Sequence, residues 1–265
     1  MNEIFLESKD FNFPQKFTGY ESKVYLYDYN SLIKIFKTDD INVLNNKLQK
    51  LKLLRSLSTN DVLPTDLVYI DGIFKGYKSV YRQDFNPIDC LKQNKKTKYY
   101  VLKRVLEKMK YYHSLGIILG DLHEENILFN KNDNEVILCD LDNFWINNLD
   151  FDTKNNYQIR YLQNHNSMQY MDEYIFNLLT ISYIQKIAYP YVLSYLRRNG
   201  LKGILNSKEN QQILEQMYKS TDNYNGDLFL NHLKKRILKW NIIFHYLNIL
   251  FLFLHYKFYF FDNLH

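Results

Sequence analysis

The amino-acid sequence predicts an α+β protein, with strands and one helix in its first part and mainly helices after residue 83. Two observations support this prediction. Short apolar runs bounded by turn residues recur through residues 17–82, as in antiparallel strands. Later segments are longer and place apolar residues at helical spacing. At 265 residues the chain has ample length for one large domain or two small lobes.

Four segments of the first part are predicted as strands. Val24–Tyr27 and Leu32–Phe36 form one pair, with a turn at Tyr27–Asn30 between them. Leu67–Ile70 and Gly76–Tyr81 form a second pair. We expect the two pairs to complete one small antiparallel sheet.

Three longer segments are predicted as helices. Asp39–Leu57 begins with acidic residues suited to an N-cap. Thr97–Leu115 has one apolar stripe and is stopped by Gly116. Met171–Ile187 is apolar on nearly all sides, which is typical of a buried central helix. Shorter helices are expected at Pro87–Asn94, Pro190–Leu201, Ser207–Lys219 and Leu228–Leu238.

Residues 240–265 form a hydrophobic tail. Its apolar run, Trp240–Phe261, is long enough to span a bilayer. It also contains Asn241, His245 and Lys257, which are costly to place in hydrocarbon. We expect a last helix packed on the preceding helices. Contact with a membrane or a partner protein is the less favoured alternative, and an atypical chain end is a third.

Composition narrows the class of protein. The net charge of +5 is mild, and no long basic run is present, so the sequence does not indicate nucleic-acid binding. The cysteines, Cys90 and Cys139, lack the spacing of a metal or redox site, and free thiols are expected. The first ten residues do not resemble a secretory signal. A cytoplasmic location is therefore expected.

A polar stretch in the middle of the chain carries the residues suited to chemistry. The apolar groups Ile127–Phe129 and Val136–Leu138 flank a polar turn, which predicts a hairpin. A hairpin brings its two ends together, so Asp121 and Asn126 before it should meet Asp140 after it. Carboxylate and amide oxygens are ligands that suit Mg²⁺ bound to a nucleotide phosphate.

The motif GDLHEEN at residues 120–126, followed by CDLDN at residues 139–143, resembles the catalytic and metal-binding loops of the protein-kinase-like superfamily. The form G-D-L-H-x-x-N is closer to aminoglycoside phosphotransferases and atypical bacterial kinases than to ordinary eukaryotic kinases. The alternative is an ordinary polar loop and hairpin in an unrelated domain. The resemblance implies a bilobal kinase-like fold, with an antiparallel β N-lobe with one helix at residues 1–82, a mainly helical C-lobe at 83–239, and the tail at 240–265.

The resemblance also implies a catalytic role for the loop. Asp121 would orient the acceptor hydroxyl and accept its proton. His123 would donate to the transferred phosphoryl group or support Asp121, although a purely structural histidine is the alternative. In kinases the aspartate at the position of Asp172 holds the backbone of this loop, whereas a simple helix-capping acid is the other interpretation.

ATP and Mg²⁺ are the cofactors that the resemblance implies. Lys34, in the strand segment I-K-I-F, would contact the α- and β-phosphates, unless it is only a surface lysine. Asn126 and Asp140 would hold Mg²⁺, and Asp142 is a second candidate ligand or a hairpin-capping acid. A loop containing Gly19 would cover the phosphates, and Val24 and Leu128 would lie on either side of the adenine.

Two departures from the kinase pattern bear on activity. Of the three glycine positions of the phosphate-covering loop, which fall at Phe17, Gly19 and Ser22, only the middle one is glycine. Kinases also pair the strand lysine with a glutamate of the following helix, yet Ile41–Ser58 contains no acidic residue. Either another carboxylate orients Lys34, with Asp140 the first choice, or activity is reduced.

The predicted function is therefore an ATP-dependent phosphotransferase, with a serine/threonine protein kinase preferred. Its partners would be ATP and a protein or small-molecule hydroxyl acceptor, without nucleic acid. A pseudokinase that binds nucleotide or serves as a regulatory module is one alternative. A small-molecule kinase of the aminoglycoside type is the other.

Overall fold

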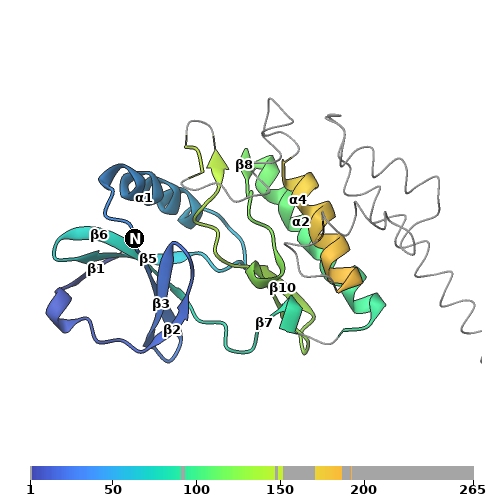
Figure 1. Cartoon of the computed structure of the whole chain (residues 1–265), viewed down its shortest axis with the longest axis horizontal. Coiled ribbons are helices and arrows are strands. Elements are labelled where there is room, and N and C mark those ends of the chain that lie inside the picture. The colour runs from blue at the N-terminus through green and yellow to red at the C-terminus, as the bar shows by residue number, and fades with distance from the viewer. Residues whose placement is uncertain (1, 91–92, 147–148, 152–170, 187–191, 193–265) are drawn as a thin grey trace, which may run out of the picture.

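The computed structural model describes residues 2–90, 93–146, 149–151, 171–186 and 192 (Figure 1). A β-rich lobe with one helix precedes a second part in which two long helices lie side by side, so the fold is the bilobal α+β kinase-like fold that the sequence predicted. A short hairpin lies between the two long helices and the first lobe (Figure 1).

The first lobe is built on a six-stranded sheet with the order β1-β5-β6-β4-β3-β2. All neighbouring strands are antiparallel except β1 and β5, which are parallel. The strands are β1 (Asn2–Leu6), β2 (Gln15–Thr18), β3 (Ser22–Asp28), β4 (Ser31–Phe36), β5 (Pro64–Ile70) and β6 (Ile73–Val80).

The four predicted strands correspond to β3, β4, β5 and β6, each of which begins one or more residues earlier than predicted, while β6 also ends one residue earlier, at Val80. Strands β1 and β2 were not predicted from the sequence. Both lie at an edge of the sheet, and most or all of their side chains are exposed. Since neither strand buries a full face, neither shows the apolar alternation by which a strand is recognised. A 3-10 turn at Ser8–Asp10 follows β1.

Helix α1 (Ile41–Arg55) packs on this sheet, as predicted. Asp40 is its N-cap, and the carboxylate accepts hydrogen bonds from the backbone amides of Asn42 and Val43. Its buried face contains Leu44, Leu51 and Leu54, but also two lysines, Lys47 and Lys50. Lysine is almost never fully buried unless its charge is paired, so these two positions require partners.

The second part contains helices α2 (Lys95–Ser114) and α4 (Met171–Gln185), both predicted. Gly116, at φ 75°, follows α2 in the left-handed conformation that ends many helices. The predicted hairpin is confirmed as β9 (Ile127–Asn130) and β10 (Glu135–Leu138). The short strands β7 (Asn86–Pro87), β8 (Ile117–Ile118) and β11 (Trp145–Ile146) complete two small sheets.

The prediction of a helix at Pro87–Asn94 was wrong for the described residues of that segment. Pro87 ends β7, and only Ile88–Cys90 forms a 3-10 turn. Asn94 instead caps α2, because its side chain accepts a hydrogen bond from the backbone amide of Thr97. The cap explains why the long helix begins at Lys95.

Several predicted elements lie outside the described residues, apart from residue 192: the helices at 190–201, 207–219 and 228–238, and the tail at 240–265. The part of the chain that the structure describes contains no helix with the length and hydrophobicity to cross a membrane.

Candidate active site

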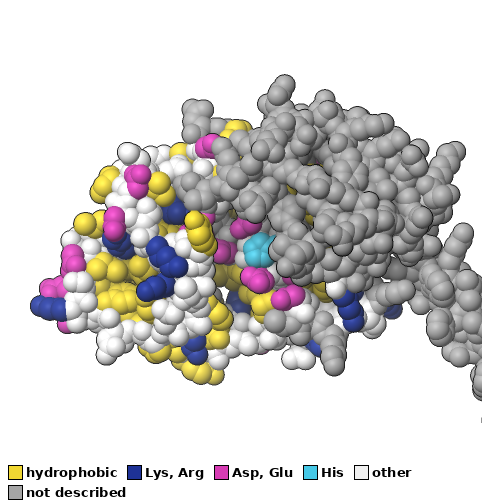
Figure 2. Space-filling view, viewed as in Figure 1, with side chains coloured by type: hydrophobic (Ala, Val, Ile, Leu, Met, Phe, Trp, Pro, Cys, Tyr) yellow, Lys and Arg dark blue, Asp and Glu magenta, His cyan; other side chains and the backbone are white. Residues whose placement is uncertain are grey.

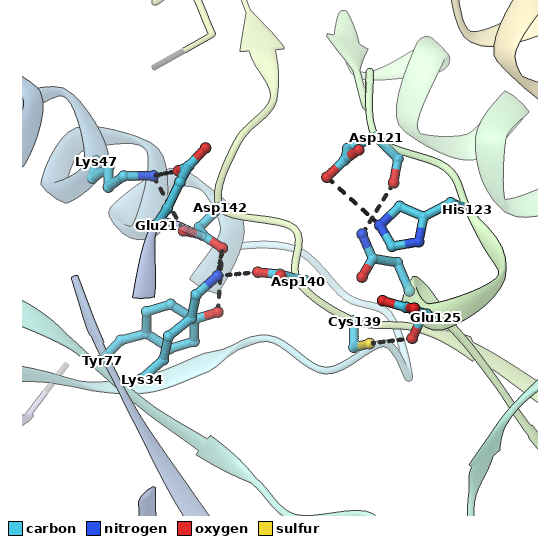
Figure 3. A network of polar contacts seen from close by, with 11 residues as sticks. Glu21, Lys34, Lys47, Tyr77, Asp121, His123, Glu125, Cys139, Asp140 and Asp142 are labelled. Carbon is cyan, nitrogen blue, oxygen red and sulfur yellow. Dashed lines mark hydrogen bonds and ion pairs between the residues drawn. The ribbon is translucent and has the colours of Figure 1, made fainter. Parts of the chain in front are cut away.

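Lys34 lies in the middle of β4, opposite Val24 of β3 and Tyr77 of β6. Its side chain is only 11% exposed. The ammonium group forms an ion pair with Asp140, 106 residues later in the chain, and lies 2.6 Å from Oδ1 of Asp142 (Figure 3). Burial alone would lower the pKa of Lys34, but the two carboxylates outweigh it and raise the pKa well above its ordinary value. The sheet therefore presents a charged lysine to the segment that follows the hairpin.

Backbone hydrogen bonds hold the hairpin end that carries Asp140. The amide of Cys139 donates to the carbonyl of Asn126 at 3.0 Å, and the amide of Leu138 donates to the buried carboxylate of Asp61 at 2.7 Å. Asp140 itself has a φ of 58°, in the left-handed region. Aspartate and asparagine adopt this conformation more readily than other non-glycine residues. The Asp140 side chain remains 45% exposed.

The loop before the hairpin, residues 121–126, brings its polar side chains close together. The amide nitrogen of Asn126 donates to the carbonyl oxygen of Asp121 at 3.1 Å. Nε2 of His123 lies 3.9 Å from Oδ2 of Asp121. Asp121 and His123 are each partly exposed, whereas Asn126 is buried at the end of a 3-10 turn, Glu124–Asn126. In Figure 2 acidic side chains and a histidine gather in the middle of the face shown.

Asp172, in the first turn of α4, fixes the start of this loop. Its buried carboxylate accepts hydrogen bonds from the backbone amides of Leu119 at 2.7 Å and Gly120 at 2.6 Å. It also contacts Nε2 of His113 on α2 at 2.8 Å. The interpretation of Asp172 as the residue that holds the loop backbone is therefore confirmed over that of a simple helix cap.

The candidate magnesium ligand Asp142 lies in a different environment from Asp140. Its side chain is 3% exposed, and its Oδ2 lies 3.3 Å from the ammonium group of Lys47. Its Oδ1 contacts Lys34 and, at 3.5 Å, the hydroxyl of Tyr77. Burial alone would raise the pKa of Asp142, but the two lysines lower it below its ordinary value. Asp142 is thus an ionised carboxylate between two ammonium groups.

Lys47 was missed in the sequence analysis. A signal for it exists, because residue 47 lies three positions after Leu44 and four before Leu51, on the apolar face of the predicted helix. A lysine at such a position indicates a buried charge with a partner. Nothing in the local sequence identifies that partner, which lies 95 residues away.

The segment expected to cover the phosphates is a tight turn between β2 and β3. The amide of Gly19 donates to the carbonyl of Ser22 at 3.0 Å, and the ammonium group of Lys37 donates to the carbonyl of Gly19 at 2.6 Å. In the same turn, Oε2 of Glu21 lies 3.3 Å from the ammonium group of Lys47. The turn is therefore tied to α1 by an ion pair (Figure 3).

The residues proposed for the adenine come from the two lobes. Val24 is half-buried in β3 and pairs with Lys34, and Leu128 is half-buried in β9. Both side chains are apolar and partly exposed, as a contact with a nucleotide base requires.

The side chains near Asp140 match the chemistry of a magnesium–nucleotide site. No three His, Cys, Asp or Glu side chains among the described residues are arranged to hold a metal ion by themselves. Mg²⁺ commonly takes only one or two protein carboxylates and completes its shell with phosphate oxygens and water. Because the side-chain nitrogen of Asn126 donates to the carbonyl of Asp121, the side-chain oxygen is the atom of this amide that could serve as a metal ligand.

Comparison with known proteins shows that a protein-family model matches the chain. The model described as serine/threonine/tyrosine kinase found in polyvalent proteins matches residues 1–147, which include the first lobe, the loop of Asp121 and the hairpin end with Asp140 and Asp142. No curated protein matches the chain.

Proposed function

Because the chain belongs to the family of serine/threonine/tyrosine kinases found in polyvalent proteins, we propose that it is an ATP-dependent phosphotransferase with a protein hydroxyl as its acceptor. The observation that carries the proposal is the ion pair of Lys34 with Asp140, across 106 residues and between the two lobes. This contact supports the proposal because it joins the lysine proposed to bind phosphate to the carboxylate proposed to bind magnesium.

The chain's own residues supply binding, orientation and proton transfer. Lys34 binds and neutralises the α- and β-phosphates, and Asn126 and Asp140 would hold Mg²⁺. When bound, Mg²⁺ neutralises charge on the phosphate oxygens. Asp121 orients the acceptor hydroxyl and takes its proton, and His123 at 3.9 Å supports that carboxylate. Phosphoryl transfer depends mainly on such positioning and charge neutralisation, so these few groups suffice.

A protein acceptor is favoured over a small molecule. The description of the family names serine, threonine and tyrosine, the residues whose hydroxyl groups accept phosphate in proteins. Serine or threonine is preferred as the acceptor.

A regulatory pseudokinase is the second candidate function. Two observations favour it: α1 contains no carboxylate to pair with Lys34, and the turn over the phosphates has only Gly19 of the three glycine positions. Against it, Asp121, Asn126, Asp140 and Lys34 are all present and lie where the two lobes meet. We therefore favour the enzyme.

Transfer of labelled phosphate tests the proposal. The full chain is incubated with ATP labelled at the γ-phosphate, Mg²⁺ and a cell extract, and the products are resolved into protein and small-molecule fractions. We expect label in the protein fraction, lost when EDTA removes Mg²⁺ and retained by a Glu107→Gln control on the exposed face of α2. Label confined to small molecules would contradict the protein acceptor, and nucleotide binding without transfer or hydrolysis would favour the pseudokinase.

A further inference from the structure

Lys47 is a buried cation on the helix where this superfamily places an acid. Its side chain is 2% exposed and lies on the α1 face that packs against the sheet. Its ammonium group is 3.3 Å from Asp142, 3.3 Å from Glu21 and 4.7 Å from the centre of the Phe36 ring. Burying an ammonium group is costly unless it is paired, so this set of contacts is a built site.

Asp142 joins Lys47 to Lys34. One carboxylate oxygen contacts Lys34 at 2.6 Å, and the other contacts Lys47 at 3.3 Å. We call Lys34, Asp142 and Lys47 the lysine cluster. Asp142 has both oxygens engaged by ammonium groups and is buried, whereas the Asp140 side chain is 45% exposed. A divalent cation at Asp142 would lie beside two positive charges, which repel it.

We propose that Lys47 is a positioning residue that orients Lys34 through Asp142, so that the direct helix-to-strand ion pair of the kinase fold is replaced by a lysine–carboxylate–lysine bridge. The helix supplies a cation instead of a carboxylate, and the carboxylate comes from the segment two residues after Asp140. This inference rests on the proposed phosphotransferase function. It removes Asp142 from the magnesium ligands and leaves Asn126 and Asp140.

The same lysine also connects α1 to the turn over the phosphates. Glu21, in the turn between β2 and β3, contacts Lys47 at the same 3.3 Å as Asp142 does. Movement of α1 would therefore change the positions of both Lys34 and the Gly19 turn. One lysine thereby couples two parts of the nucleotide site.

Four variants test the bridge through Asp142: Lys47→Glu, Asp142→Asn, the double variant that combines them, and the control Lys52→Glu on the exposed face of the same helix. Lys47→Glu adds a third carboxylate to the surroundings of Lys34, beside Asp140 and Asp142, and should lower kcat for transfer roughly 10- to 100-fold, as loss of an orienting partner usually does. The KM for ATP should change less, because a displaced lysine costs most in the transition state. Lys52→Glu should change neither constant by more than about twofold, as expected for a surface change.

The double variant gives the decisive comparison. Removing the Asp142 charge leaves Lys34 paired with Asp140 and with one carboxylate from the helix, which is the ordinary kinase arrangement. We expect the double variant to transfer phosphate roughly tenfold faster than Lys47→Glu alone, a recovery typical of coupled residues. If Asp142 were a magnesium ligand, its loss would add to the defect. Thermal unfolding should show the same partial recovery, which provides a readout independent of transfer.

The outcomes separate this inference from the proposed function. If the wild-type chain transfers phosphate but the double variant is no better than Lys47→Glu in rate and melting temperature, the bridge through Asp142 is overturned and the proposed function stands. A wild-type chain that neither binds nor transfers the nucleotide's phosphate would overturn the proposed function and the inference with it.

Discussion

The two sides of the candidate site are held in place in different ways. The loop of residues 121–126 is fixed by backbone hydrogen bonds, to Asp172 at its start and to Cys139 at its end. The lysine cluster is fixed by ion pairs between side chains that are 95 to 108 residues apart in sequence. The loop keeps the family pattern, whereas the cluster departs from it. We infer that the loop keeps the residues proposed for catalysis while the charges around Lys34 are rearranged.

The strongest expected effect is on the loop side, at Asp121. Asp121→Asn keeps the size of the side chain but removes the proton acceptor, so the rate of phosphoryl transfer should fall roughly 10²- to 10⁴-fold. Binding of Mg-ATP, measured by calorimetry, should be nearly unchanged because the proposed role of Asp121 is toward the acceptor hydroxyl and not toward the nucleotide. A variant that transfers at the wild-type rate would remove Asp121 from the mechanism.

A second test breaks the anchor of the loop. Asp172→Asn places an amide nitrogen against the backbone amides of Leu119 and Gly120 and removes the buried charge beside His113. The free energy of unfolding should fall by about 3 kcal/mol or more, as when one partner of a buried pair is lost. Urea unfolding measures this, with Glu107→Gln as the surface control. A change below 1 kcal/mol would show that the loop is held by other contacts.

A smaller effect is expected at the N-terminus of α1, the helix that supplies Lys47. Asp40→Ala removes the hydrogen bonds to the amides of Asn42 and Val43. Loss of an N-cap should cost about 1 kcal/mol of stability. The buried face of α1 is unchanged in this variant. If the position of α1 sets the position of the Lys34 side chain, the rate of transfer should nevertheless fall as well. Unaltered transfer at reduced stability would show that the cap supports the helix without affecting the site.

The smallest expected effect depends on pH and concerns His113. Burial lowers the pKa of His113, but the hydrogen bond and charge of Asp172, together with Glu173, outweigh it and raise the pKa above 6.5. A raised pKa in the folded chain means that the protonated form favours folding. The stability that His113 contributes should therefore be complete below pH 6.5 and be lost as the pH rises through the raised pKa. His113→Gln should flatten this part of the pH profile of thermal unfolding, and an unchanged profile would assign it to another group.

The sequence predicted the loop side better than the lysine cluster, for a physical reason. Asp121, Asn126 and Asp140 flank one hairpin, and the apolar runs that form β9 and β10 are local, so their convergence followed from the pattern. Lys34 was placed by a strand pattern and a motif resemblance. The pairing of Lys47 with Asp142 depends on how α1 packs on the sheet, which no local pattern encodes. The edge strands β1 and β2 were missed for a related reason, since strands that bury little carry little periodic signal.

The central claim is that Lys34 and Asp140 meet at a nucleotide site. Its most direct test compares the transfer of γ-phosphate by Lys34→Met with transfer by the wild-type chain and by Lys52→Glu. We predict that the wild-type chain and Lys52→Glu transfer phosphate at similar rates, while Lys34→Met loses transfer by roughly 100-fold or more, the size seen when one charge-stabilising group is removed. Transfer by Lys34→Met at the wild-type rate would contradict the proposed site.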